Sequence, residues 1–324
     1  MSSRSPLRQF AKRILFGPMS FAQQCPIGLP DPQQEVIVRL HGRGEPRDVT
    51  RNHLMASGAP FTIGIGLETQ QSLGAANRSL SLRFYSREDE KLLGFIALQP
   101  AAVIPAGPRF LHLFHCRSFK NFCLPKPWLW SRYLHYTYMR SRAPAPDVRP
   151  TMRELHSMFV FYICPRPVVL GGVCDGSHSN VFPMNLMGPI GDGYFSFALN
   201  RARPVTALVS RAGRVALSSL PFAQSSIALQ FGKNHKVEHI DLAQLPFSTK
   251  PSPNFRLPVP DFALRVREIQ VEAAHNVGSH TLFIARIIHD DRWAHGPEMF
   301  VVHGIYQAAR HRSHPQLAGE SLAT

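Results

Sequence analysis

Short apolar segments separated by proline and glycine constrain this chain more than any other feature of its sequence. The 324 residues include 28 prolines, which lack a backbone N–H and therefore interrupt helices and central strands. Residues 35–40 and 79–85 alternate polar and apolar side chains, as half-buried strands do. Residues 215–220 suit either a strand or a short helix, and one amphipathic helix is expected over residues 128–136. We therefore predict a mainly β protein.

A proline-rich segment divides the chain into two parts. Residues 143–150 read APAPDVRP, a composition typical of linkers. We predict a basic N-terminal tail (1–34), a β-rich domain of unassigned chemistry (35–142), a Pro-rich linker (143–157), a second β-rich domain (158–312) and a C-terminal tail (313–324). In the second domain many short strands alternate with turn signals, which is typical of a barrel or sandwich. We find no convincing long repeat in the sequence.

Composition narrows the class of protein. The net charge is +15, which favours anionic partners. However, no Lys/Arg block and no aromatic RNA-binding signature stand out, so we do not expect nucleic acid as a partner. The five cysteines are odd in number and scattered, which favours reduced thiols and a cytoplasmic location. No apolar run approaches the ~20 residues of a membrane helix, so we expect no membrane association.

Two local patterns resemble parts of a dinucleotide-binding turn and a zinc site, but each lacks features that such a site requires. Gly64 and Gly66 lack the third glycine and following helix of a dinucleotide-binding turn. His112, His115 and Cys116 lie on one strand-like run, where alternation puts His112 and Cys116 on one face and His115 on the other. A zinc site needs a converging tetrahedron of ligands. We therefore predict no metal site.

The most informative block runs from residue 161 to 188. Pro165-Arg166-Pro167 leads an apolar strand, a polar turn follows at Asp175-Gly176, and a second strand leaves through Asn180 and Pro183. This order and spacing resemble the flavin reductase family, whose members share an FMN-binding split barrel. Later segments continue the resemblance in the same order: residues 194–201, Arg203 and Thr206, residues 278–287, and residues 301–306.

The resemblance implies a fold and a cofactor. The second domain would be a Greek-key split β-barrel with an additional β-rich N-terminal domain before it. It would bind FMN, with FAD as a second possibility, use NADPH or NADH as cosubstrate, and pair as a homodimer with the flavin near the interface. Ser279 stands where the family usually has an acidic residue, and Ala207-Leu208-Val209 replaces a more polar run. These departures leave open a non-catalytic flavin-binding or assembly module with a macromolecular partner.

The residues expected at the flavin carry suitable chemistry. Arg201, Arg203 and the Thr206 hydroxyl suit a phosphate, and His280 would position the reacting groups as the single catalytic candidate. Asn180 and Asn185 match the pyrimidine edge of a flavin but are also ordinary turn residues. Met184 and Leu186 suit either a flavin wall or the core, and His280 could equally be a core histidine. The full expected cofactor set is Asn180, Pro183, Met184, Asn185, Leu186, Asn200, Arg201, Arg203 and Thr206.

Overall fold

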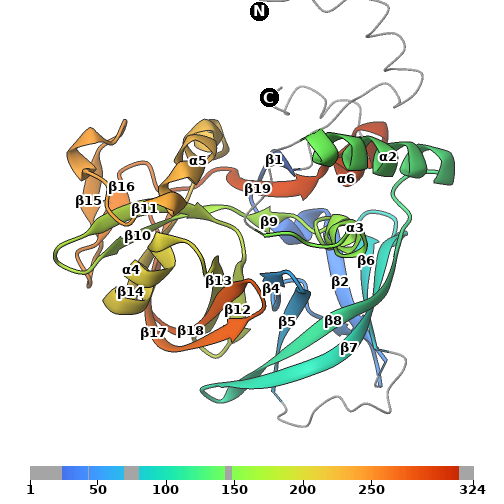
Figure 1. The fold of residues 1–324 in the computed structure, drawn as a ribbon, viewed down its shortest axis with the longest axis horizontal. Coiled ribbons are helices and arrows are strands. Elements are labelled where there is room, and N and C mark those ends of the chain that lie inside the picture. The colour runs from blue at the N-terminus through green and yellow to red at the C-terminus, as the bar shows by residue number, and fades with distance from the viewer. Residues whose placement is uncertain (1–23, 43, 69–79, 143–147, 314–324) are drawn as a thin grey trace, which may run out of the picture.

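The computed structural model describes residues 24–42, 44–68, 80–142 and 148–313 (Figure 1). Most of the predicted basic tail, residues 143–147 of the predicted linker and residues 314–324 of the predicted C-terminal tail lie outside these ranges. The fold is mainly β, as predicted, and is built on two seven-stranded sheets joined by a three-stranded one. Residues 24–34, assigned above to the tail, form a strand and a 3₁₀ turn, β1 (Gln24–Leu29) and η1 (Pro32–Gln34).

The first seven-stranded sheet comes from the N-terminal half. Its strand order is β3-β2-β6-β7-β8-β5-β4. The bounds are β2 (Val36–His41), β3 (Arg47–Asp48), β4 (His53–Gly58), β5 (Phe61–Leu67), β6 (Ser81–Ser86), β7 (Leu92–Ala106) and β8 (Arg109–Asn121). Two helices follow it, α2 (Lys126–Arg142), which extends the predicted helix at both ends, and α3 (Met152–Phe161), which carries a Thr151/Glu154 capping box.

The second seven-stranded sheet comes from the C-terminal half. Its order is β11-β10-β14-β17-β18-β13-β12. The bounds are β10 (Val169–Cys174), β11 (Ser179–Met184), β12 (Met187–Gly191), β13 (Tyr194–Asn200), β14 (Arg214–Ser219), β17 (Arg265–Val277) and β18 (His280–Arg292). The segment that suited either a strand or a helix is thus strand β14. Helix α4 (Pro204–Ala212) packs its apolar face, including Val205, Leu208 and Val209, into the core of this barrel.

The remaining elements connect or cover the two sheets. They are β9 (Arg166–Pro167), η2 (Phe222–Gln224), α5 (Ser225–Phe231), η3 (Gly232–Lys236), η4 (Leu242–Gln244), β15 (Thr249–Pro251), β16 (Pro258–Pro260), β19 (Glu298–His303) and α6 (Gly304–Ser313). Strands β1, β19 and β9 form the small sheet, so the N-terminal strand pairs with the last strand of the chain. Strand β19 ends at His303, because helix α6 begins at Gly304, so the segment 301–306 that continued the resemblance is part strand and part helix.

The two large sheets have the same topology, which the sequence did not reveal. Numbering the strands of each sheet in chain order, both read 2-1-5-6-7-4-3, and every neighbouring pair is antiparallel. In each half, strands six and seven form a long hairpin, β7–β8 and β17–β18. The N-terminal half is therefore a second barrel with the same strand order.

The two barrels pack on each other through equivalent elements. β4 of the first barrel lies beside β12, its counterpart in the second, and both stand at the centre of Figure 1. An apolar cluster fills the contact, with members from both barrels: Leu54, Ala56, Ile104, Ala106, Leu111, Leu113, Ile190, Ala198, Leu282 and Ile284. Reciprocal packing of this kind is the geometry of a two-fold subunit interface, here formed within one chain.

All five cysteines are free, which agrees with the expectation of reduced thiols. In the described parts of the chain, no helix has the length and apolar character needed to cross a bilayer.

A close approach of two backbones at the contact between the barrels can be tested by substitution. A Cβ placed on Gly66 of β5 would lie 2.4 Å from the carbonyl oxygen of Ile190 on β12. We therefore expect Gly66→Ala to lower the free energy of unfolding by about 1–3 kcal/mol, because the two backbones must separate. Urea denaturation of the full chain measures this change. Gly232→Ala is the control, since no atom lies within 4 Å of its added Cβ. An equal effect in both variants would contradict the tight contact.

Candidate functional site

The loop after β13 forms a basic turn at the start of α4. The Asn200 side chain accepts a hydrogen bond from the Ala202 N–H at 3.0 Å, and the Asn200 carbonyl accepts one from the Thr206 hydroxyl at 2.7 Å. Arg203 is the N-cap of α4 but places no side-chain hydrogen bond on the helix, and Arg201 is exposed. The loop therefore presents two guanidinium groups beside a helix N-terminus with no side-chain cap, which is an anion-binding arrangement.

The Thr206 hydroxyl is engaged within its own loop. Its side chain is buried, with 4% exposed, and its hydroxyl proton points to the Asn200 carbonyl. In this geometry Thr206 closes the loop between β13 and α4.

The imidazole of His235 lies near this basic loop. Its Nε2 lies 2.6 Å from the carbonyl oxygen of Pro183, one of the predicted cofactor residues. Burial, and then the charge of the nearby Arg203, lower the pKa of His235. The His235 side chain is half-buried and lies between β11 and the start of α4.

His280 lies at the contact between the two barrels. Its Nδ1 accepts a hydrogen bond from the Gly58 N–H at 3.3 Å and lies 2.9 Å from the Ser279 hydroxyl. The Ser279 N–H in turn donates to the Ala59 carbonyl at 2.8 Å, and the Ser279 hydroxyl accepts from the Ala59 N–H at 3.1 Å. The turn between β4 and β5 thus holds the start of β18. Burial lowers the pKa of His280 to about 4, so the ring is neutral at pH 7.

The basic loop and His280 are neighbours in space. Asn200 and His280 are directly paired across β13 and β18, and the Arg201 N–H donates to the Ser279 carbonyl at 3.1 Å. The structure therefore brings together Asn200, Arg201, Arg203 and His280 from the predicted set.

Asn180 is directed elsewhere. It is fully buried on β11, and its amide donates to the carbonyls of Asn234 at 3.1 Å and Val237 at 2.9 Å. The Asn234 side-chain amide in turn donates a hydrogen bond to the Val181 carbonyl at 2.7 Å. In this structure the pair of amides fastens the segment after α5 to the barrel, which is a structural use of Asn180.

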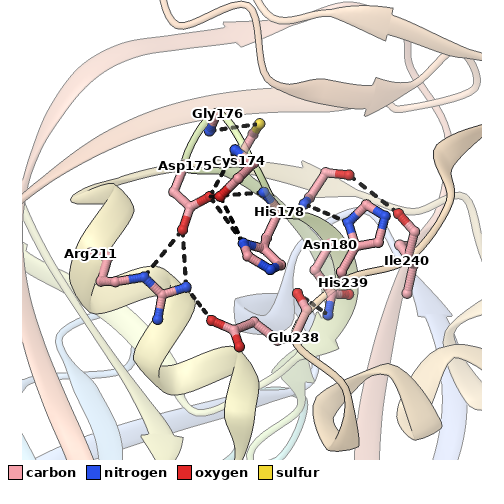
Figure 2. A network of polar contacts seen from close by, with 11 residues as sticks. Cys174, Asp175, Gly176, His178, Asn180, Arg211, Glu238, His239 and Ile240 are labelled. Atoms are coloured by element: carbon pink, nitrogen blue, oxygen red, sulfur yellow. Dashed lines mark hydrogen bonds and ion pairs between the residues drawn. The ribbon is translucent and has the colours of Figure 1, made fainter.

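An ionic network reinforces the same attachment (Figure 2). Arg211 near the end of α4 contacts Asp175 at 3.0 Å in the β10–β11 turn and also pairs with Glu238. The backbone N–H of His178 and the Arg211 guanidinium lower the pKa of Asp175 well below its usual range. Both carboxylates neutralise Arg211, so the network serves to hold the turn, α4 and residues 237–240 together.

The other predicted residues line the inner side of this region. Met184 is buried in the core of the second barrel, and Leu186 packs against apolar clusters of both barrels. The Asn185 amide donates to the Tyr162 hydroxyl at 3.4 Å. Met184 is thus a core residue, whereas Asn185 and Leu186 are half-buried between the barrels.

Sequence reasoning did not find the residues that the first barrel contributes. Ser57, Gly58 and Ala59 contact the start of β18, yet in the sequence they are only a turn between two apolar runs. No local signal marks such a contact, because the partners lie more than 200 residues apart. Within the described residues no three metal-ligating side chains converge on one point.

The described residues thus form two β-barrels in one chain. A basic loop at the start of α4 lies beside the buried His280, which is at the contact between the barrels. Residues 161–301 match the family model described as a flavin reductase like domain. The second half of the chain therefore carries a flavin reductase-like domain, as the motifs predicted. No curated protein matches the chain.

Solved structures that match part of the chain do so at low identity. The NADH:FAD oxidoreductase of Streptomyces globisporus is 18% identical, with a TM-score of 0.41, and the match covers 48% of this chain and 94% of that one. The FMN-binding protein from Thermus thermophilus is 21% identical, with a TM-score of 0.37 and coverage of 47% and 79%. The styrene monooxygenase flavin reductase from Pseudomonas putida is 20% identical, with a TM-score of 0.37 and coverage of 44% and 90%.

The lowered pKa of His280 predicts a pH dependence. Its pKa is about 4 in the folded chain and about 6.5 in the unfolded chain. The unfolded chain therefore binds more protons between these values, and stability is lost as the pH falls below about 6.5. The variant His280→Asn keeps an acceptor for the Gly58 N–H. We expect its free energy of unfolding to fall by about 2 kcal/mol less than that of the wild type between pH 7 and pH 5. Urea denaturation at both pH values measures the difference.

The control for this comparison is His295→Asn, since His295 is exposed and should leave the pH dependence unchanged. If His280→Asn and His295→Asn both follow the wild-type curve, His280 does not titrate as described.

Proposed function

We propose that the protein binds FMN at the contact between its two barrels and transfers hydride between a nicotinamide and the flavin. The observation that carries the proposal is the basic loop of a flavin reductase-like domain, Arg201 and Arg203 at the start of α4, directly beside His280. FAD, which also carries phosphate, is the second candidate cofactor. The choice between NADH and NADPH is part of the experiment below.

The residues present fit a flavin mononucleotide. Arg201 and Arg203 would hold its phosphate, because guanidinium groups match phosphate geometry and the positive end of the α4 dipole also favours anions. Asn185 and Leu186 would face the ring system, with one amide for its polar edge and one apolar side chain for its face. Pro183 would shape this wall. Asn180, Met184 and Thr206 would support the site from behind.

Hydride transfer places modest demands on the protein. The flavin supplies the hydride-accepting chemistry when it is bound. The side chains have to orient the reactants and exclude water, and no strong acid or base is required. His280 is neutral, fixed by Gly58 and Ser279, and suits a positioning role in which Nε2 remains available as a donor.

The first barrel takes a defined part in this proposal. The family resemblance predicted pairing with a second copy of the chain. Here the first barrel packs against the second through the equivalent strands β4 and β12. We propose that it fills the place of the second copy and completes the site through the β4–β5 turn.

One observation favours the alternative of a non-catalytic flavin-binding module. The hydrogen bonds of His280 Nδ1 and of Ser279 are taken up by the β4–β5 turn, so both groups already serve the contact between the barrels. A module of this kind would hold flavin without accepting hydride from a nicotinamide.

The visible absorption spectrum separates these possibilities. We expect the protein, saturated with FMN and desalted, to retain the flavin absorption bands and to lose them after anaerobic addition of NADH or NADPH. Retained bands that do not bleach would favour the module. No retained flavin, together with no oxidation of either nicotinamide in the presence of free FMN, would overturn both.

The phosphate contact has its own test. We expect the double variant Arg201→Gln/Arg203→Gln to bind FMN at least about tenfold more weakly, because charge-assisted hydrogen bonds are lost. Riboflavin, which lacks the phosphate, should bind the variant and the wild type equally. Arg286→Gln is the control, since this exposed arginine pairs with Glu272 at 3.0 Å. Equal weakening of FMN and riboflavin would contradict a phosphate contact. Fluorescence titration measures all three proteins.

A further inference from the structure

A cavity lies at the end of the C-terminal barrel that is opposite to His280. Its volume is about 450 Å³. Strand β18 runs from His280 to Arg292, and Arg292 lines this cavity. The first barrel closes one side of it through Asp31, Thr50 and Arg51. The cavity is therefore separate from the basic loop at α4 and, like that loop, lies where both halves of the chain meet.

The cavity wall is rich in arginine. Five lining residues are arginines: Arg51, Arg166, Arg265, Arg267 and Arg292. Three carboxylates pair with four of them: Asp31 with Arg51, Asp290 with Arg265 and Arg267 at 2.5 and 2.7 Å, and Glu298 with Arg292 at 2.8 Å. The wall thus carries an excess of about two positive charges, which attracts an anion.

Arg166 is the cation without a counterion. Only 4% of it is exposed, its Nη2 donates to the Met187 carbonyl at 2.7 Å, and its Nη1 lies 3.3 Å from His53 Nε2. Its Nε has no hydrogen-bond partner, and across the described ranges no carboxylate pairs with it. An uncompensated buried charge is costly, so a bound anion near Arg166 would stabilise the fold.

The neighbouring histidine does not compensate this charge. His53 is fully buried, and burial together with Arg166 lowers its pKa to about 3. Its Nδ1 lies 2.7 Å from the Val49 carbonyl, so Nδ1 carries the proton and Nε2 accepts from Arg166. His53 is therefore a neutral support that fixes the guanidinium at the cavity wall.

The rest of the wall is apolar and partly aromatic. Pro167, Pro189, Phe195 and Phe300 line the cavity between the arginines. The Arg267 guanidinium lies over the Phe195 ring, 4.8 Å from its centroid. Such a wall suits a ligand with a charged end and an apolar body.

We propose that this cavity, the arginine cavity, binds a small organic anion with an apolar ring or chain and a carboxylate or phosphate group. Arg166 and the other arginines would hold the anionic group, because guanidinium forks match both carboxylate and phosphate geometry. The apolar part would lie against Phe195 and Phe300. This site is independent of the proposed flavin site and gives the Pro165-Arg166-Pro167 motif a binding role.

Calorimetric titration of the full chain tests the proposal with three probes, phenyl phosphate, benzoate and inorganic phosphate. We expect phenyl phosphate or benzoate to bind one saturable site more tightly than inorganic phosphate, because only these carry an apolar part. The better of the two identifies phosphate or carboxylate as the anionic group. Arg51→Gln and Arg265→Gln, both at partly exposed positions, should each weaken binding about tenfold.

Arg286→Gln is the matched control, because it removes a paired arginine from the same strand, β18, outside the cavity. It should bind the probes as the wild type does, and saturation with FMN should leave probe binding unchanged. No saturable binding of any probe, equal weakening in Arg286→Gln, or displacement of the probe by FMN would overturn a separate anion site.

Discussion

The packing of one barrel against the other is the contact on which the rest of the molecule depends. β4 and β12 meet at its centre, and the surrounding apolar cluster draws on both halves of the chain. Apolar burial of this extent is the main favourable term in folding and association. Because Gly58 and Ala59 fix Ser279 and His280 across this contact, the arrangement of the candidate flavin site follows from it. The arginine cavity is closed by the same meeting of the two halves.

Much of the second barrel follows from its sequence, since its signals are local. The turn at Asp175-Gly176, the order of strands around it and the helix after Arg203 are encoded within a few residues of where they form. The duplication of topology is not local, because the two halves place different side chains on equivalent strands. Even within the site, the structural use of Asn180 and Thr206 depends on carbonyls whose position is set by the fold. Residue type alone could not distinguish these uses from contacts with a cofactor.

Arginines collect at opposite ends of β18, beside the start of α4 and around Arg166. Each group lies where the two barrels meet, and several members are held by carboxylates in fixed orientations. Held in this way, guanidinium groups lose little conformational freedom when an anion binds. These arginines are thus oriented in advance for an anion, and they account for only part of the net charge of +15.

The covalent link between the barrels has a consequence for how the two related contacts can differ. In a symmetric dimer of identical chains, any substitution at the interface occurs twice. Here the β4–β5 turn contacts β18 through neutral hydrogen bonds to Ser279. The equivalent β12–β13 turn contacts the start of β8 through an ion pair between Asp192 and Arg109. Each contact can therefore change without altering the other. One half of the chain can thus serve as a scaffold while the other half carries the proposed flavin site.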